Sequence, residues 1–316
     1  MNNIYFKKLL KGDIPTLAQS ITLMESSLDS DKKKSNYLIN KCLKIKKDSF
    51  RICISGAPGV GKSTFINNLL NHLIQKKKKI AVLTIDPSSE KSKGSILGDK
   101  TRMVNFSNNN NVFIRSSPSK GELGGVSKKT RESIILCEAA GFDIIIIETT
   151  GVGQTEITAK KMTDFFILLT IPNSGDHLQA IKKGIVEIAD LIIINKIDAI
   201  SEIEIEKEKN YYSQIKNDDK YQKIQICSAK QDFGIKNICK ILNETYLSKI
   251  KKGDLKTNRQ SQIEYWVHNS IKDKLLTKFY NQKNIDKEIK KIIEEVKKEN
   301  INIDEPSEKL VNKYLK

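Results

Sequence analysis

The sequence predicts an α/β fold in which helices cover a mostly parallel, doubly wound β-sheet. Short β-branched apolar runs recur along the middle of the chain, at residues 50–55, 80–85, 112–115, 143–148, 165–170, 191–195 and 224–228. Stretches with helical spacing separate most of these runs. Continuous apolar strands that alternate with helices are typical of a parallel sheet buried on both faces.

Polar helical segments flank this alternating core on both sides. Residues 1–47 show helical spacing without strand signals and predict a helical N-terminal extension. We assign residues 48–250 to the core domain and residues 251–316 to a helical C-terminal arm. One apolar stripe in the arm contains Ile263, Trp266, Val267, Ile271, Leu275 and Phe279. An arm this polar buries little by itself, so the stripe predicts packing on the core or on another chain, and we favour a homodimer.

The composition is less informative than the pattern. The formal charge of +17 at pH 7 is typical of proteins that bind nucleic acid or anionic membranes. The excess is nearly all lysine with asparagine nearby, and an AT-rich genome explains that bias at least as well as a ligand does. No recognition motif accompanies the charge, so we expect no nucleic-acid partner.

The cysteine pattern and the length of the apolar runs indicate in which cellular compartment we expect the protein. Five cysteines are scattered without a C-x-x-C pair: Cys42, Cys53, Cys137, Cys227 and Cys239. Three of them fall in apolar surroundings, which favours buried free thiols. The scattered pattern fits a reducing compartment. The longest apolar run, around 144–147, is too short to span a bilayer, and the N-terminus lacks a signal or transit pattern. We therefore expect a cytoplasmic protein without membrane contact.

The strongest chemical signal follows the first predicted strand. Residues 56–64 satisfy the pattern G-x-x-x-x-G-K-[ST] of a phosphate-binding loop (P-loop) and lead into a predicted helix at 62–75. Glycines let successive amide N–H groups point at phosphates, and the helix N-terminus adds partial positive charge. We expect Lys62 to reach the β- and γ-phosphates and Ser63 to bind Mg²⁺. The predicted nucleotide-binding residues are Gly56, Ala57, Pro58, Gly59, Val60, Gly61, Lys62, Ser63 and Thr64.

A second motif identifies the base. Residues 195–198 read N-K-I-D directly after an apolar strand. A carboxylate at Asp198 accepts two hydrogen bonds from guanine, which adenine cannot supply, so the site discriminates by a factor on the order of 10⁴. Residues 228–230 read S-A-K after the last strand, where GTPases place a loop whose backbone contacts the guanine oxygen. We expect GTP to be bound through Asn195, Lys196, Asp198, Ser228, Ala229 and Lys230.

Three acidic residues lie between these motifs. Asp86 and Glu148 end predicted strands, and Asp99 lies in the string L-G-D-K-T-R. Ligands bind at the carboxyl ends of parallel strands, and Mg²⁺ takes only one or two protein carboxylates. Some of the three therefore act through water, and the sequence leaves open which. The amide of Gly151 is placed to sense the γ-phosphate, which predicts a switch segment at 148–156.

Longer strings extend the pattern: D-P-S-S at 86–89, G-D-K-T-R-M at 98–103, G-G-V-S at 124–127, E-T-T-G-V-G-Q-T-E at 148–156 and G-D-H-L-Q-A-I-K-K-G-I at 175–185. With the P-loop, they resemble the MeaB/ArgK-type G proteins, bacterial relatives of the methylmalonic aciduria type A protein. The resemblance implies a homodimeric GTPase chaperone of an adenosylcobalamin-dependent acyl-CoA mutase, chiefly methylmalonyl-CoA mutase. Such a chaperone gates cofactor loading and protects the mutase.

The resemblance also assigns roles by matched position. The phosphate, magnesium and hydrolysis residues that it implies are Lys62, Ser63, Asp86, Asp99 and Glu148. The residues that it implies for coupling to the partner are Gly175, Asp176, Gln179, Lys182 and Lys183. His177 stands where the family usually has an acidic residue. This departure bears on the identity of the partner more than on the GTPase activity.

Two other functions fit parts of the pattern. A metal-insertion GTPase needs soft or imidazole ligands, whereas this chain has no C-x-x-C and only three histidines. A kinase of a periplasmic amino-acid transport system, an older description of ArgK-type sequences, needs a base for a protein hydroxyl that no motif marks. The string D-x-H-x-x-G is also missing, so we expect the mutase, not this chain, to hold cobalamin.

Overall fold

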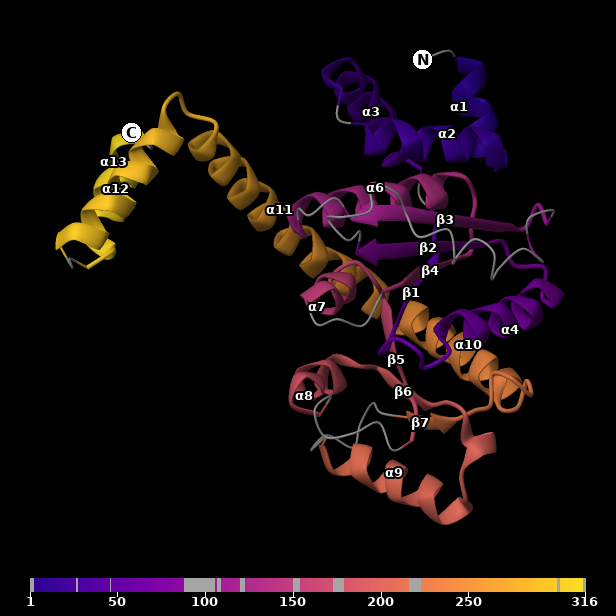
Figure 1. Cartoon of the computed structure of the whole chain (residues 1–316). Coiled ribbons are helices and arrows are strands. Elements are labelled where there is room, and N and C mark those ends of the chain that lie inside the picture. Colours follow the sequence, from indigo (N-terminus) through magenta and orange to yellow (C-terminus); the bar gives the residue numbers. More distant parts are fainter. Residues whose placement is uncertain are drawn as a thin grey trace. The chain divides into compact units, whose positions relative to one another are not determined.

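The computed structural model describes residues 3–26, 28–45, 47–87, 106, 109–119, 123–149, 154–172, 179–215, 223–299 and 302–314. Within these residues, a seven-stranded sheet has the order β3-β2-β4-β1-β5-β6-β7 (Figure 1). Its strands are β1 (Phe50–Ser55), β2 (Ile80–Pro87), β3 (Val112–Ser119), β4 (Ile144–Glu148), β5 (Phe165–Thr170), β6 (Leu191–Ile194) and β7 (Lys223–Ile226).

Every strand pairing in this described sheet is parallel. The chain builds one half of the sheet with β2, β3 and β4, and then returns past β1 to build the other half with β5, β6 and β7. The predicted doubly wound α/β fold is therefore confirmed. The loop after β1 leaves the sheet where the strand order reverses, which is where open parallel sheets bind their ligands.

Helices cover the two faces of the sheet. They are α4 (Lys62–Gln75), α6 (Leu123–Ala139), α7 (Gln154–Lys160), α8 (Gln179–Ile188), α9 (Glu202–Ile215) and α10 (Ile235–Lys252), with the short 3₁₀ helix η3 (Ile197–Ala199) after β6. Alternate residues of a strand point to opposite faces. Ile52 and Ile54 of β1 therefore join a buried cluster with α4 and α10, whereas Cys53 joins one with α7, α8 and α9.

Three helices precede the sheet: α1 (Asn3–Leu10), α2 (Ile14–Glu25) and α3 (Asp29–Cys42). Asp13 caps α2, because its carboxylate accepts a hydrogen bond of 3.0 Å from the backbone N of Thr16. Leu17 and Ile21 are fully buried, and α2 and α3 contact α6. The predicted helical N-terminal extension is confirmed, and the predicted boundaries at residues 47 and 250 stay predictions.

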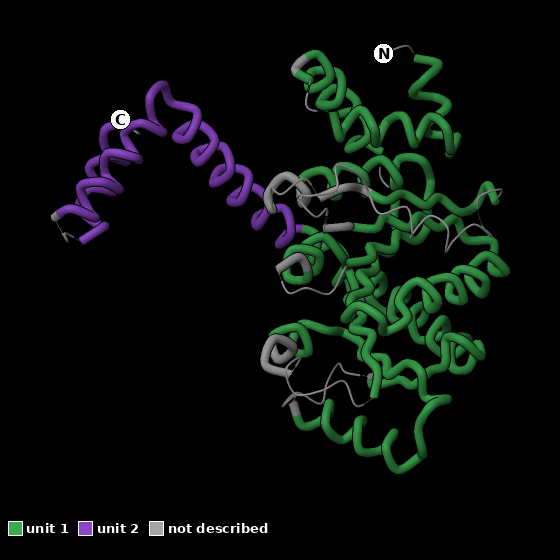
Figure 2. The backbone as a smooth tube through the Cα atoms, in the orientation of Figure 1, with its two compact units in different colours: residues 1–259 green, residues 260–316 purple. Residues whose placement is uncertain are grey.

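The chain divides into two compact units, residues 1–259 and residues 260–316 (Figure 2). The last helices are α11 (Asp254–Tyr280), α12 (Ile285–Glu299) and α13 (Asp304–Tyr314). In the second unit, Phe279, Ile285 and Leu310 form a small buried cluster. No helix in the described part of the chain combines the length and apolar character that crossing a membrane requires.

The predicted apolar stripe of the C-terminal arm divides into buried and exposed members. Trp266 is 9% exposed and Phe279 is 8% exposed. The members that are 49–63% exposed are Ile263, Val267, Ile271 and Leu275. The exposed line therefore has a regular four-residue spacing along α11, which places its members on neighbouring turns.

All five cysteines are buried and free of disulfide bonds, whereas the sequence predicted burial for three of them. Burial raises the pKa of Cys42 to about 11 and that of Cys227 to about 12. Because the thiolate is the reactive form, these thiols are packing groups.

Candidate nucleotide-binding site

The P-loop curves tightly between β1 and α4. A Cβ atom at Gly56 would lie 2.2 Å from the backbone oxygen of Leu169 on β5. Gly61 has φ +94°, and a Cβ atom there would lie 2.7 Å from Nδ2 of Asn195. Only glycine permits this close approach of the loop to the neighbouring strands.

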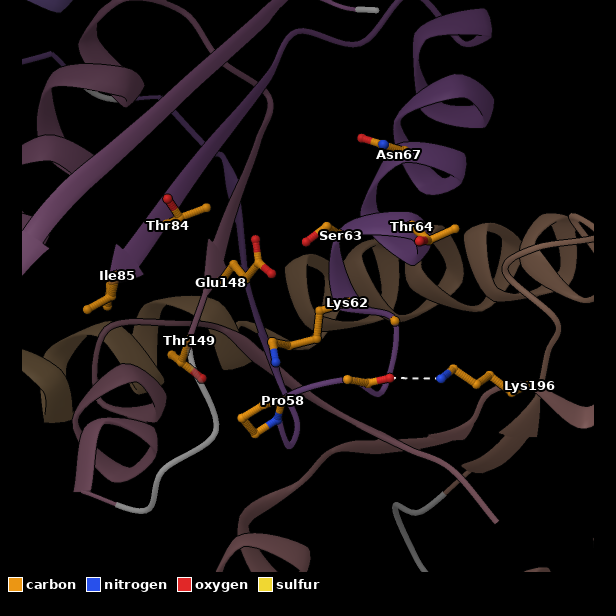
Figure 3. A pocket seen from close by; sticks show the side chains of 12 residues that line it. Pro58, Lys62, Ser63, Thr64, Asn67, Thr84, Ile85, Glu148, Thr149 and Lys196 are labelled. Carbon is orange, nitrogen blue, oxygen red and sulfur yellow. Dashed lines mark hydrogen bonds between the residues drawn. The ribbon is translucent and has the colours of Figure 1, made fainter. Parts of the chain in front are cut away.

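Two lysines reach the loop (Figure 3). Lys62 donates from Nζ to the backbone oxygens of Gly56 and Ala57, at 2.7 and 3.1 Å. Lys196 donates from Nζ to the backbone oxygen of Gly59, at 2.9 Å. Both ammonium groups are thus held beside the curve of the loop, where phosphate oxygens can replace the carbonyl oxygens as acceptors.

A cavity of about 780 Å³ opens beside the loop. This volume suits a ligand larger than a metal ion or a single phosphate. Its described lining residues are Pro58, Gly59, Gly61, Lys62, Ser63, Thr64, Asn67, Thr84, Ile85, Glu148, Thr149 and Lys196. The cavity therefore unites the P-loop with the ends of β2 and β4, as the sequence predicts for a nucleotide-binding site.

Side chains with oxygen atoms that can contact a metal ion or its waters lie at the ends of β2 and β4. Thr84 on β2 is the register partner of Glu148 on β4, and Glu148 extends toward Ser63 in Figure 3. Thr84 is 4% exposed and Thr149 is 0% exposed, and neither hydroxyl oxygen has a hydrogen-bond partner among the described residues. Mg²⁺ prefers oxygen ligands and retains water molecules that need such partners. These residues therefore fit a hydrated magnesium ion.

Asn195 joins the base-recognition loops to the P-loop. It donates from Nδ2 to the backbone oxygen of Val60 at 2.8 Å, and its Oδ1 accepts from the backbone N of Ala229 at 2.9 Å. Asn68 of α4 donates to the backbone oxygen of Ala229. Asn195 and Ala229 thus hold three loops in one arrangement, and the amide that reads the guanine oxygen stays a prediction.

Asp198 presents the carboxylate that is predicted to read the base. The side chain is exposed at the start of η3, and its Oδ1 accepts a 2.5 Å hydrogen bond from the Ser228 hydroxyl. This hydrogen bond lowers the pKa of Asp198 below its ordinary value. The carboxylate is therefore ionised near neutral pH and can accept hydrogen bonds from guanine.

Several predicted site residues have no described geometry. Asp99, Gly151, Gly175 and Asp176 lie outside the described residues. Asp86 is described only as part of the β2 backbone, where it pairs in register with Pro118. The backbone of α8 includes the other predicted coupling residues, Gln179, Lys182 and Lys183.

Sequence analysis did not assign four lining residues to the nucleotide site, namely Asn67, Thr84, Ile85 and Thr149, although Thr149 lies in the predicted switch segment. A signal for Thr84 was present. On β2, Ile80 and Val82 face α4, and the next residue on that face is Thr84. A polar residue that interrupts an apolar face at a strand end indicates a site.

Comparison with known proteins identifies the family. The family described as "Methylmalonyl Co-A mutase-associated GTPase MeaB" matches residues 17–284. The chain belongs to this family. It is accordingly a P-loop GTPase, which binds GTP and GDP and hydrolyses GTP.

Relatives of this MeaB-family GTPase are found in animals and bacteria. A methylmalonic aciduria type A homolog of Caenorhabditis elegans, named as mitochondrial, is 40% identical over 291 residues, which cover 87% of this chain and 73% of that protein. GTPase ArgK of Escherichia coli is 37% identical over 287 residues, covering 89% and 87% of the two chains. The crystal structure of an LAO/AO transport system kinase superposes with a TM-score of 0.77 at 28% identity, covering 100% and 99% of the two chains.

Proposed function

We propose that this GTPase is a chaperone of an adenosylcobalamin-dependent acyl-CoA mutase, such as methylmalonyl-CoA mutase. It would gate loading of the cofactor and protect the mutase, with GTP hydrolysis as the timer. The observation that carries the proposal is the family match over residues 17–284, which includes the nucleotide site, α8 and α11. The names of the relatives in animals agree with a role in methylmalonate metabolism.

In this proposal, Lys62 binds the β- and γ-phosphates and the Ser63 hydroxyl holds Mg²⁺. Bound magnesium neutralises charge on the phosphates. Asp86, Asp99 and Glu148 act on the metal or on the attacking water, directly or through other waters.

Glu148 offers a test of this arrangement. Replacing Glu148 with Gln keeps its size and removes its charge, so we expect kcat to fall by a factor on the order of 10² while GTP affinity stays within about threefold. Single-turnover hydrolysis and calorimetry measure the two quantities. Equal losses in both would leave Glu148 with a structural role.

The positions of the described arginines support the expectation that GTP hydrolysis by this chain alone is slow. Arg51, Arg115 and Arg259 each pair with a carboxylate elsewhere in the described structure. The described lining of the cavity contains lysines but no arginine. An arginine finger accelerates related reactions by a factor on the order of 10³–10⁵, so a partner that supplies one would act as a switch.

We assign coupling to the partner to the segment from Gly175 to Lys183. Its second half begins α8, and α8 leads directly to β6, whose end carries the base-reading motif. A partner that shifts this segment therefore acts on the same strand that positions Asn195. The residues proposed for this coupling are Gly175, Asp176, Gln179, Lys182 and Lys183.

The proposed homodimer uses the exposed line of α11. Because Arg259 at the start of this helix bonds to Asp164, deleting the arm would also disturb the first unit. Point substitution is the cleaner test. The double variant Ile271→Lys with Leu275→Lys should be monomeric by light scattering, whereas Ile203→Lys, at a residue 83% exposed on α9, should leave the dimer intact. A dimeric double variant would contradict the interface.

The partner itself is tested by affinity purification from the native host in the presence of GDP or a GTP analogue, followed by mass spectrometry. We expect an acyl-CoA mutase subunit. Recovery of a transport component or a nickel enzyme instead would contradict the proposal. The solved relative is called a transport system kinase, so γ-labelled GTP should also be followed. Label in inorganic phosphate supports the GTPase timer, whereas label on a protein would favour the kinase.

A further inference from the structure

On the side of the sheet that faces α4, the side chains change from apolar to polar at the same register position of two neighbouring strands, β2 and β4. Ile80 and Val82 of β2 belong to the buried cluster under α4, and so do Ile144 and Ile146 of β4. The next residues on this face are Thr84 and Glu148, which are register partners. The apolar layer therefore ends on both strands in an oxygen-bearing side chain.

Packing does not account for the hydroxyl of Thr84. Its residue is 4% exposed, and Oγ1 has no hydrogen-bond partner among the described residues. Valine has the same shape and would continue the apolar layer, whereas a buried hydroxyl without a partner destabilises a folded protein. A destabilising polar group beside a ligand cavity indicates that the ligand supplies the missing partner.

The surroundings indicate the chemistry of that partner. Thr84 lines the same cavity as Ser63 and Glu148, and Figure 3 shows Thr84 and Glu148 on neighbouring strands. Water bound to Mg²⁺ is a strong hydrogen-bond donor, and the ion keeps several such waters. A hydroxyl oxygen beside a carboxylate is a suitable acceptor for one of them.

We infer that Thr84 is a positioning residue that holds a magnesium-bound water in the GTPase site. Its hydroxyl accepts a hydrogen bond from that water, next to Glu148. The inference rests on the proposed magnesium site and adds a residue of β2 to it. The role concerns metal affinity more than nucleotide affinity.

The test compares Thr84→Val, which keeps the shape, with Thr84→Ser, which keeps the hydroxyl. Mg²⁺ is titrated into each full-length protein with a fluorescent, non-hydrolysable GTP analogue. We expect the magnesium midpoint of Thr84→Val to rise about five- to tenfold, as loss of one hydrogen bond predicts, and that of Thr84→Ser to stay within about twofold of wild type. Affinity for the analogue in EDTA should be the same for all three proteins.

Thermal unfolding without nucleotide gives a second readout. Thr84→Val should raise the melting temperature by about 2–4 °C, because it removes a buried hydroxyl without a partner. An unchanged magnesium midpoint, equal behaviour of the two variants, or a lower melting temperature for Thr84→Val would each overturn the inference. If wild-type binding did not depend on magnesium, the proposed metal site would itself fail, and that result is distinct from a failure of Thr84 alone.

Discussion

The amino and carboxyl edges of the parallel sheet both collect charged side chains, and they hold them differently. At the amino edge, Arg51 at the start of β1 donates from Nε and Nη2 to the two carboxylate oxygens of Glu138, both at 2.8 Å. Arg259 of α11 donates from Nη2 and Nε to Asp164, just before β5, at 2.9 and 3.2 Å. Arginine and carboxylate thus satisfy each other in two bidentate pairs.

At the carboxyl edge, Lys62 and Lys196 donate to neutral backbone oxygens of the P-loop. Two buried hydroxyls, of Thr84 and Thr149, have no partner among the described residues. The difference teaches which edge is structural and which is built for a ligand. The lysines can exchange their neutral carbonyl acceptors for phosphate oxygens. The partly buried arginines already have carboxylate partners, and no stronger acceptor is available to them.

The largest expected effect concerns the carboxyl edge. Replacing Asp198 with Asn removes the acceptor proposed to pair with guanine. The change should favour xanthine nucleotides and shift the ratio of GTP to XTP affinity by a factor on the order of 10⁴. Competition binding with the two nucleotides measures this ratio. Because Asp198 is exposed, we expect little change in the free energy of unfolding. Retained preference for GTP would remove its base-reading role.

The next effect should appear at the amino edge. Asp164→Ala leaves the partly buried guanidinium of Arg259 without its main partner, since the Asp164 side chain is 0% exposed and accepts two hydrogen bonds from Arg259. We expect the free energy of unfolding in urea to fall by about 3–5 kcal/mol. Protein that stays folded should still prefer GTP. A loss of base preference without a loss of stability would contradict the division between the two edges.

Lys62→Ala tests whether the P-loop lysine at the carboxyl edge of the sheet binds phosphate. Losing a charge-assisted hydrogen bond to phosphate should weaken GTP binding by about 10- to 100-fold in calorimetry. Lys236→Ala, at an exposed lysine of α10, removes the same charge elsewhere and should leave affinity unchanged. Equal effects of both variants would mean that net charge, not position, drives binding.

Ser228→Ala should have the smallest effect. The Ser228 hydroxyl orients Asp198 and lowers its pKa, so its removal should weaken GDP binding about three- to tenfold at pH 7. The depressed pKa keeps Asp198 ionised as the pH falls, and binding is lost only when the pH drops through that pKa. In the variant the pKa rises toward its ordinary value, so the loss on acidification should begin at higher pH. Identical pH profiles between about pH 5 and pH 3, a range that contains the ordinary pKa of 3.8, would contradict this role.

The order of elements and the two recognition motifs could be read directly from the sequence. Their signals are local. Alternation along the strand places Ile52 and Ile54 on one face of β1. The glycine and lysine pattern directly after a predicted strand predicts the P-loop. The helix α13 lies within the predicted helical arm, but the sequence did not predict its bounds, because only Leu310, Val311 and Tyr314 interrupt its polar sequence. Pro306 in its first turn was an available start signal.

The sequence by itself therefore determined a parallel α/β fold with a P-loop, and it predicted a carboxylate that reads guanine. Only the tertiary structure decided that Thr84 lies level with Glu148, that Asn195 joins Val60 to Ala229, and that Arg259 binds Asp164. The physical reason is that such pairs depend on strand order and register, which are set by burial over the whole core. Short-range patterns establish which face a residue occupies, but not which distant residue it meets there.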